Sequence, residues 1–253
     1  MLSEGFLLPS STHLKINLKM KKILLIFSLL FFSISMNSQV LITLLLGDKL
    51  NTGKIEFGLE IGYNWSTISG FEADKYSSTF NIGFYFDFLL KNQWYLYTGT
   101  LVKAKLGVDH LTQNDLDFLQ ADVYAEAGDY SQQINTFLVP ALVKYKFKNH
   151  FYLEAGPQFG LMYNSWVEYN STVDGKDGRI KEYNKDMIHR LDAGLMAGFG
   201  FQALKGKGMQ YGIKYYYGLV DAFKEKSGTK NSSFFVKVNI PIGANKKDEK
   251  IED

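Results

Sequence analysis

The chain has 253 residues, of which 46% are apolar and 21% charged, and its formal net charge is +2. The absence of cysteine excludes disulfides, thiolate metal sites and a cysteine nucleophile. Residues 1–39 carry four lysines and one glutamate, a charge of +3, so the rest of the chain carries 2 − 3 = −1. This balance excludes the basic footprint of a nucleic-acid-binding protein, and we expect no nucleic-acid partner.

The N-terminal region has the pattern of a secretory signal peptide. Lys21 and Lys22 precede an apolar run over 23–36, and small or polar residues follow at 37–39. The run is shorter than the roughly 20 residues of a membrane-spanning helix, although a second apolar run at 40–46 leaves an uncleaved anchor as the alternative. We therefore predict an upstream extension at 1–19, a cleaved signal peptide at 20–39 that forms a signal helix, and a periplasmic segment at 40–53.

Residues 54–243 contain eight runs that alternate between apolar and polar side chains, such as "EFGLEIGYNWS" from Glu56 and "FNIGFYFDF" from Phe80. Period-2 alternation over nine or more residues predicts β-strands, and only the facing of the third run, 94–108, is ambiguous. The connections alternate between tight turns (90–93, 148–150, 205–208) and long loops (69–78, 109–133, 168–188, 222–231). This arrangement predicts an all-β fold, an eight-stranded antiparallel up-and-down transmembrane β-barrel, with a charged tail at 244–253.

One face of these runs is bulky and aromatic, whereas the other carries glycines and charges of both signs. Eight strands enclose an interior that side chains only just fill, so we predict that the glycine-rich polar face is inside. The predicted interior polar cluster, with a structural role, contains Glu60, Asp87, Lys144, Glu154, Gln158, Asp192, Lys214 and Lys237. We expect Lys144 opposite Glu154, and Lys237 beside Glu60. A proton or ion path through the cluster is the alternative role, and a secreted lipocalin-like barrel with its apolar face around a small ligand is the alternative fold.

The central hairpin contains a P-x-L-x-K-Y strand, a tight turn and a Y-x-E-x-G-P-x-x-G strand. The matching residues are Pro140, Leu142, Lys144, Tyr145, Tyr152, Glu154, Gly156, Pro157 and Gly160. In these motifs, and in "GLEIGYNWSTI" from Gly58, residues 54–243 resemble the PorT-like outer-membrane β-barrel family of Gram-negative bacteria. The resemblance implies an outer-membrane barrel, and the family's namesake is linked to protein secretion. The chain departs from the family near Gly99, where a Pro-Glu pair is missing, and in its charged C-terminal tail.

Few residues are candidates for chemistry. His110 and His189 lie in or beside long loops and could form a rim acyltransferase site with Asp109, Asp192 and Ser165, but solvated loop residues are the simpler interpretation. The acidic loop 109–133 and the segment 171–179 could bind calcium, although the latter lacks the spacing of a calcium loop.

We therefore expect no catalytic activity, no cofactor and no metal. The expected role is structural, in binding or in secretion support, through the extracellular loops or the periplasmic rim. The expected partners are outer-membrane lipid and an unidentified protein, and we expect a monomer.

Overall fold

A computed structural model of the chain describes residues 53–173 and 176–242. The predicted extension at 1–19, the signal peptide at 20–39, the segment 40–52 and the tail at 244–253 lie outside the described residues. No helix in the described part of the chain is both long and apolar enough to cross a membrane.

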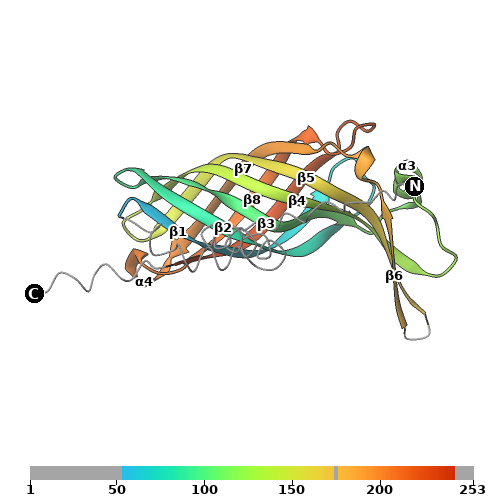
Figure 1. The fold of residues 1–253 in the computed structure, drawn as a ribbon, viewed down its shortest axis with the longest axis horizontal. Coiled ribbons are helices and arrows are strands. Elements are labelled where there is room, and N and C mark those ends of the chain that lie inside the picture. Colours follow the sequence, from blue (N-terminus) through green and yellow to red (C-terminus); the bar gives the residue numbers. More distant parts are fainter. Residues whose placement is uncertain (1–52, 174–175, 243–253) are drawn as a thin grey trace, which may run out of the picture. The chain divides into compact units, whose positions relative to one another are not determined.

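Eight antiparallel strands close into a ring, in the order β1-β2-β3-β4-β5-β7-β8-β9 and back to β1 (Figure 1). A ninth strand, β6, pairs only with the outer part of β5. The strands are β1 (Ile55–Ile68), β2 (Lys75–Lys91), β3 (Trp94–Asp109), β4 (Gly128–Lys146), β5 (Phe151–Val173), β6 (Lys176–Tyr183), β7 (Leu191–Gln202), β8 (Gln210–Asp221) and β9 (Lys230–Pro241). The predicted eight-stranded barrel is confirmed, and β6 is an addition to it.

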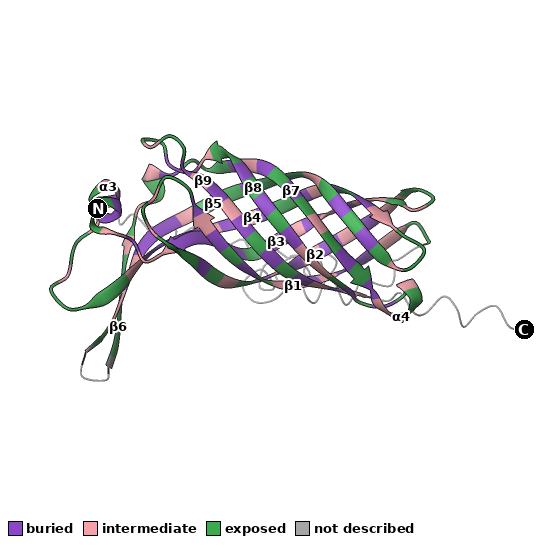
Figure 2. Ribbon diagram, turned by 180° about the vertical axis from the view of Figure 1, so that it is seen from behind, coloured by how far each residue is buried: buried purple, intermediate pink, exposed green. Residues whose placement is uncertain are grey.

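The apolar and polar side chains that alternate in the sequence point alternately to the outer wall of the barrel and into its lumen. Along β5, Leu153 and Phe159 are 53% and 51% exposed, whereas Glu154 and Gln158 are at most 2% exposed. Figure 2 shows the same striping of buried and exposed residues along neighbouring strands. The large apolar side chains therefore face outward, which is the reverse of what a lipocalin-like ligand carrier requires.

The ambiguous facing of β3 has a structural cause. Tyr97 and Leu101 are buried at its start, and Ala104, Leu106 and Val108 are buried after a register shift between positions 101 and 104. One extra residue in a strand moves every later side chain to the opposite face. No single period-2 assignment fits β3, because its inward positions change from odd to even at the bulge.

The tight turns lie at one rim, where Asn92, His150 and Lys205 adopt positive φ angles of 54°, 70° and 53°. The third of these turns contains the four-residue element α4 (Ala203–Gly206), in which Leu204 and Lys205 have left-handed backbone angles. The connections at the other rim are more ordered than expected. Residues 109–133 contain helix α3 (Gln113–Leu119) and the start of β4, and residues 168–188 contain the β5–β6 hairpin and the 3-10 helix η2 (Lys185–Met187).

These long connections are ordered because they bury apolar side chains against one another. The residues involved form a cap that continues the barrel interior and contains Ile68, Val108, Leu111, Leu116, Leu119, Ile134, Met162, Val167, Ile188, Ala222 and Phe223. The rings of Phe71 and Phe118 lie 5.3 and 5.6 Å from that of Phe223. Asp115 belongs to a capping box with Thr112 at the start of α3, so this acidic residue has a structural task.

Candidate functional site

The eight residues of the predicted interior cluster are all buried, each with at most 2% exposure. Six of them belong to ion pairs near the rim of the tight turns. Lys144 Nζ lies 2.9 Å from Asp87 Oδ1 and 3.4 Å from Glu154 Oε2. Lys237 Nζ lies 2.6 Å from Glu154 Oε1, and Lys214 Nζ lies 2.6 Å from Glu60 Oε1. Each buried carboxylate of this group therefore has an ammonium partner, which offsets the cost of removing its charge from water.

One expected pair is present, and the other two residues are neighbours on adjacent strands that form their ion pairs with other partners. Lys144 is the direct cross-strand partner of Glu154, as the symmetry of the hairpin predicts. Lys237 lies diagonally beside Glu60 on the neighbouring strand, because in the β1–β9 register Lys237 is opposite Gly62 and Asn239 is opposite Glu60. Lys237 reaches across the lumen to Glu154 instead, and Glu60 pairs with Lys214.

Gln158 and Asp192 lie apart from these ion pairs. Asp192 accepts a hydrogen bond of 3.1 Å from Asn231 Nδ2, and within the described residues no lysine, arginine or histidine pairs with it. Among the same residues, both polar atoms of the Gln158 amide have no hydrogen-bond partner. The predicted cluster is thus an ionic network of six residues and two separate polar positions.

Several members of the network are absent from the sequence prediction. Lys146 Nζ lies 3.0 Å from Asp87 Oδ2, and its place in the alternation, two residues after Lys144, puts it on the same inward face. Gln210 accepts from Lys144 at 3.0 Å and donates to Asp87 at 3.0 Å. The Tyr97 ring lies 4.1 Å from Lys144 Nζ and 4.0 Å from Lys237 Nζ, and its hydroxyl donates to Glu60. Tyr97 could not be assigned from the sequence, because the facing of β3 was ambiguous.

Apolar side chains occupy the lumen alongside the ionic network and up to the cap. This group contains Tyr85, Tyr97, Leu101, Ala104, Leu106, Leu138, Leu142, Met196, Tyr216 and Phe235, each at most 2% exposed. Glycines let large neighbours fit, as at Gly212, where a Cβ atom would lie 2.3 Å from the Tyr152 hydroxyl. The ionic network, the apolar filling and the cap together leave a lumen that is occupied by side chains.

The candidate catalytic residues do not form a site. His110 contacts Lys75 at 3.0 Å and Asp129 at 3.5 Å. Ser165 is fully buried and donates to Asn184 at 2.7 Å. In the described part of the chain, no hydrogen bond or ion pair joins Ser165 or Asp192 to His110 or His189. A nucleophile and a base within hydrogen-bonding reach are therefore not found among these residues.

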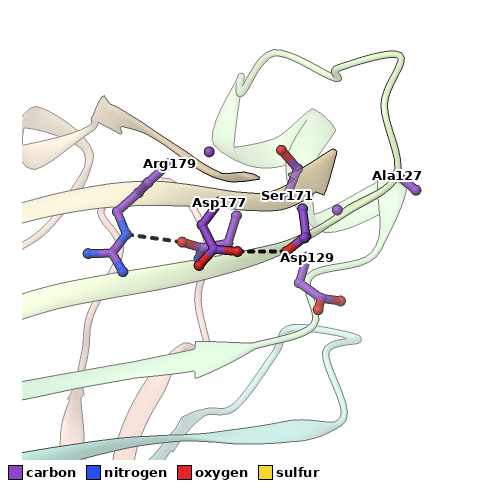
Figure 3. A pocket seen from close by; sticks show the side chains of 9 residues that line it. Ala127, Asp129, Ser171, Asp177 and Arg179 are labelled. Atoms are coloured by element: carbon purple, nitrogen blue, oxygen red, sulfur yellow. Dashed lines mark hydrogen bonds between the residues drawn. The ribbon is translucent and has the colours of Figure 1, made fainter. Parts of the chain in front are cut away.

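The described residues of the segment 171–179, compared above with a calcium loop, belong to the paired strands β5 and β6. Figure 3 shows the pocket beside these residues, of about 850 Å³, with Asp129, Ser171, Asp177 and Arg179 at its edge. Thr172 donates to Asp177 at 3.0 Å, and Arg179 Nε donates to Asn170 at 3.1 Å. Within residues 53–173 and 176–242, no group of three or more acidic or histidine side chains is placed to hold a metal ion.

A second groove, of about 440 Å³, crosses the strands at the rim of the long connections. Lys105, Glu168, Arg179 and Lys181 contribute to its lining. Glu168 accepts from the Trp166 indole at 3.0 Å and lies 3.5 Å from Arg179 and 3.4 Å from Lys181. Burial alone would raise the pKa of Glu168, but the Trp166 hydrogen bond and the two cations lower it below its usual value.

A family model described as "Outer membrane protein beta-barrel domain" matches residues 38–224 of the chain, which is most of its length. The chain belongs to this outer-membrane β-barrel family. No curated protein matches the chain in sequence. Family membership gives the barrel its location in the outer membrane.

Solved structures of other outer-membrane barrels are distantly similar. Ail, the attachment invasion locus protein of Yersinia pestis, was solved in complex with the heparin analogue sucrose octasulfate; it is 12% identical with a TM-score of 0.41, over 75% of this chain and 99% of Ail. Neisserial surface protein A is 7% identical with a TM-score of 0.38, over 74% and 96% of the two chains. OprG from Pseudomonas aeruginosa is 11% identical with a TM-score of 0.30, over 74% and 91%.

Proposed function

We propose that this outer-membrane barrel is a non-enzymatic membrane anchor that presents an ordered extracellular sheet to a protein partner. The observation that supports the proposal is the contrast between the filled lumen of the barrel and the sheet that extends beyond the cap. The lumen is filled by ion pairs, rings and an apolar cap, whereas β4, β5 and β6 continue beyond the cap as a hydrogen-bonded sheet. Short turns mark the periplasmic rim of outer-membrane barrels, so this sheet is on the extracellular side.

The extracellular sheet is stabilised by specific contacts rather than by the barrel alone. The Tyr124 and Tyr169 rings stack at 4.7 Å, and the Tyr169 hydroxyl donates to the Glu126 carbonyl at 2.7 Å. The Tyr124 hydroxyl donates to Glu182 at 2.9 Å, and this hydrogen bond raises the pKa of Tyr124 to about 12. Ordered surfaces lose less conformational entropy on binding than flexible loops do, which suits a recognition role.

The experiment is a capture assay with a shortened hairpin. A variant in which an Asn-Gly turn joins Val167 directly to Glu182 removes the outer part of β5–β6 and leaves the eight-stranded ring intact. We expect the full-length protein to retain an extracellular partner that the shortened protein loses, while both keep heat-modifiable migration. Capture of the same partner by both proteins would contradict the proposal.

A second candidate function, secretion support as in the PorT-like family, is favoured by a groove at the periplasmic rim. This groove, of about 340 Å³, is lined in part by Glu56, Asp87, Lys146, His150 and Gln202. It would suit a periplasmic partner with a polar surface. This function would be supported over the first if the wild-type protein and the shortened-hairpin variant both capture the same partner. The His150→Ala variant should lose that partner.

A further inference from the structure

The outward surface of the barrel changes abruptly just beyond its apolar wall on the extracellular side. On β4 the outward positions pass from Val139 and Phe137 to Asn135, Gln133 and Ser131. Cross-strand neighbours share a face of the sheet, so the partners of these residues also face outward. These partners are Lys105 opposite Asn135, Trp166 opposite Gln133, and Glu168 opposite Ser131, followed by Lys181 on β6.

The bulge in β3 determines where two lysines lie. Continuing the alternation of Tyr97 and Leu101 would put Lys103 and Lys105 into the lumen. After the register shift, Lys103 is opposite the outward Ile82 and Lys105 is opposite Asn135. Bulges commonly redirect side chains at functional positions, and this one puts two cations at the upper edge of the apolar wall.

Neither of these two lysines is close enough to a described carboxylate to form an ion pair, and the charge of Glu168 acts on Lys105 only from a greater distance. Within the described residues, no ion pair or side-chain hydrogen bond involves the ammonium of Lys103 or of Lys105. Lys105 Nζ lies 5.3 Å from the centre of the Trp166 ring, and Lys181 Nζ lies 4.5 Å from the same ring. Trp166 is only 3% exposed, so its ring is a fixed surface beside both ammonium groups.

The neighbouring cations are held in place by one carboxylate. Glu168 lies 3.5 Å from Arg179 Nε and 3.4 Å from Lys181 Nζ, so a single negative charge is shared by two positive ones. The other acids that line the groove have partners of their own. Gln133 donates to Asp109 at 3.3 Å, and His110 lies 3.5 Å from Asp129. The net charge of the groove is positive, because four cations against three carboxylates line it: Lys75, Lys105, Arg179 and Lys181 against Asp109, Asp129 and Glu168.

We propose that Lys103, Lys105, Arg179 and Lys181 bind the phosphate of a phosphorylated lipid head group in the outer leaflet. The groove of about 440 Å³ is in the size range of small-ligand sites, roughly 300–1,000 Å³. A lipid is the occupant because the site continues directly into the apolar wall at Phe137 and Tyr163, which would contact the acyl chains. The proposal is independent of any protein partner of the extracellular sheet.

The test measures lipid retained by the detergent-purified protein in native mass spectrometry. The probes are a bisphosphorylated lipid A, the same lipid without its phosphates, and inorganic phosphate alone. We expect the wild-type protein to retain the phosphorylated lipid, and the K103Q/K105Q variant to bind it about 30-fold more weakly, from about 1 kcal/mol per basic residue at a membrane surface. The control variant K185Q/K224Q removes the same charge from the loops and should bind like the wild type.

Heat-modifiable migration verifies that each variant is folded. If K103Q/K105Q does not fold, R179Q/K181Q tests the same site from the hairpin outside the barrel ring, with the same loss expected. Equal retention of the dephosphorylated lipid, or wild-type affinity in the folded lysine variants, would overturn the proposal. Competition by inorganic phosphate at millimolar concentration would also overturn it, because the occupant would then be a free anion. The binding is expected to weaken as salt is added. Unchanged lipid binding up to 1 M salt would contradict the electrostatic basis of the proposal.

Discussion

Lys144 is the residue on which most of the ionic network depends. Its ammonium lies within 3.4 Å of Asp87, Glu154 and Gln210, and the Tyr97 and Tyr152 rings lie 4.1 and 4.7 Å away. Removing one partner of a buried ion pair leaves an uncompensated charge, which is the costly step. The loss of one member of the network therefore lowers the stability of the barrel more than the number of its ion pairs suggests.

We predict that Lys144→Met lowers the free energy of unfolding by about 3–5 kcal/mol, because Asp87 and Glu154 lose a shared cation. The lower end of this range is expected, since Lys146 and Lys237 still contact these carboxylates. The measurement is the urea midpoint of heat-modifiable migration in detergent. Lys148→Met, at an exposed turn, is the control and should leave the midpoint unchanged. The same midpoint for Lys144→Met and the wild type would refute the structural role of the network.

Gly212 tests whether the lumen is filled as tightly as described. A Cβ atom at this position would lie 2.3 Å from the Tyr152 hydroxyl and 3.2 Å from Lys237 Cε. We expect Gly212→Ala to destabilise the barrel by about 1–3 kcal/mol, as overpacking does. Tyr152→Phe in the same chain should restore part of the loss, whereas Gly53→Ala, with open space around it, should have no effect. A neutral Gly212→Ala would show that the lumen has free volume.

At the scale of elements, β6 joins the sheet by pairing with the outer part of β5. The outward face of this hairpin depends on Glu168, whose pKa is lowered by Trp166, Arg179 and Lys181 despite the opposing effect of burial. A carboxylate with a lowered pKa stabilises the folded state fully above its unfolded pKa, near 4.5, and this stabilisation is lost as the pH falls through the lower folded value.

We therefore predict that amide exchange in β6 accelerates as the pH falls below about 4.5, relative to the intrinsic rate at each pH. Hydrogen exchange followed by mass spectrometry of peptides over 176–183 measures the effect. Glu168→Gln should remove the pH dependence and leave exchange in β7 and β8 unchanged. An unchanged pH profile in Glu168→Gln would show that another group controls the hairpin.

The elements also show how far the sequence could predict this molecule. Period-2 alternation identified the wall and lumen faces of β1, β2, β4 and β5, because lipid and a narrow interior demand opposite side chains. The same rule could not assign β3, since a bulge between Leu101 and Ala104 reverses its facing. It also could not predict which ions meet across the lumen, as Lys237 and Glu154 do, because that depends on closure of the ring and its stagger.

The long connections were the other limit of prediction. The sequence predicts an acidic loop at 109–133. In the structure, Leu116 and Leu119 of α3 are buried in one cluster with Phe223 from the connection 222–231. The sequence also predicts a loop at 168–188, where the structure has the β5–β6 hairpin. A sheet that extends past the membrane has water on its outer face, so its strands lack the apolar signal of the wall.

For the whole molecule, a filled lumen has a direct electrical consequence. We predict that the protein reconstituted in a planar bilayer shows no steady single-channel conductance, because ion pairs, rings and the cap occupy the interior along its length. Shortening the β5–β6 hairpin between Val167 and Glu182 should not create a channel, since the residues of the cap and of the apolar filling lie outside the removed segment. Reproducible, salt-dependent conductance steps from the wild-type protein would contradict a closed lumen.

The central claim, a barrel with its apolar wall in lipid and its β4–β5–β6 sheet in water, is tested most directly by site-specific quenching. The chain has no cysteine, so single cysteines can be introduced and labelled with a fluorophore at Leu153 on the wall and at Thr172 on the hairpin. In liposomes, we predict that a lipid-attached nitroxide quenches the label at position 153 and that aqueous iodide quenches the label at position 172. The account would be contradicted by strong iodide quenching at position 153 without quenching from lipid.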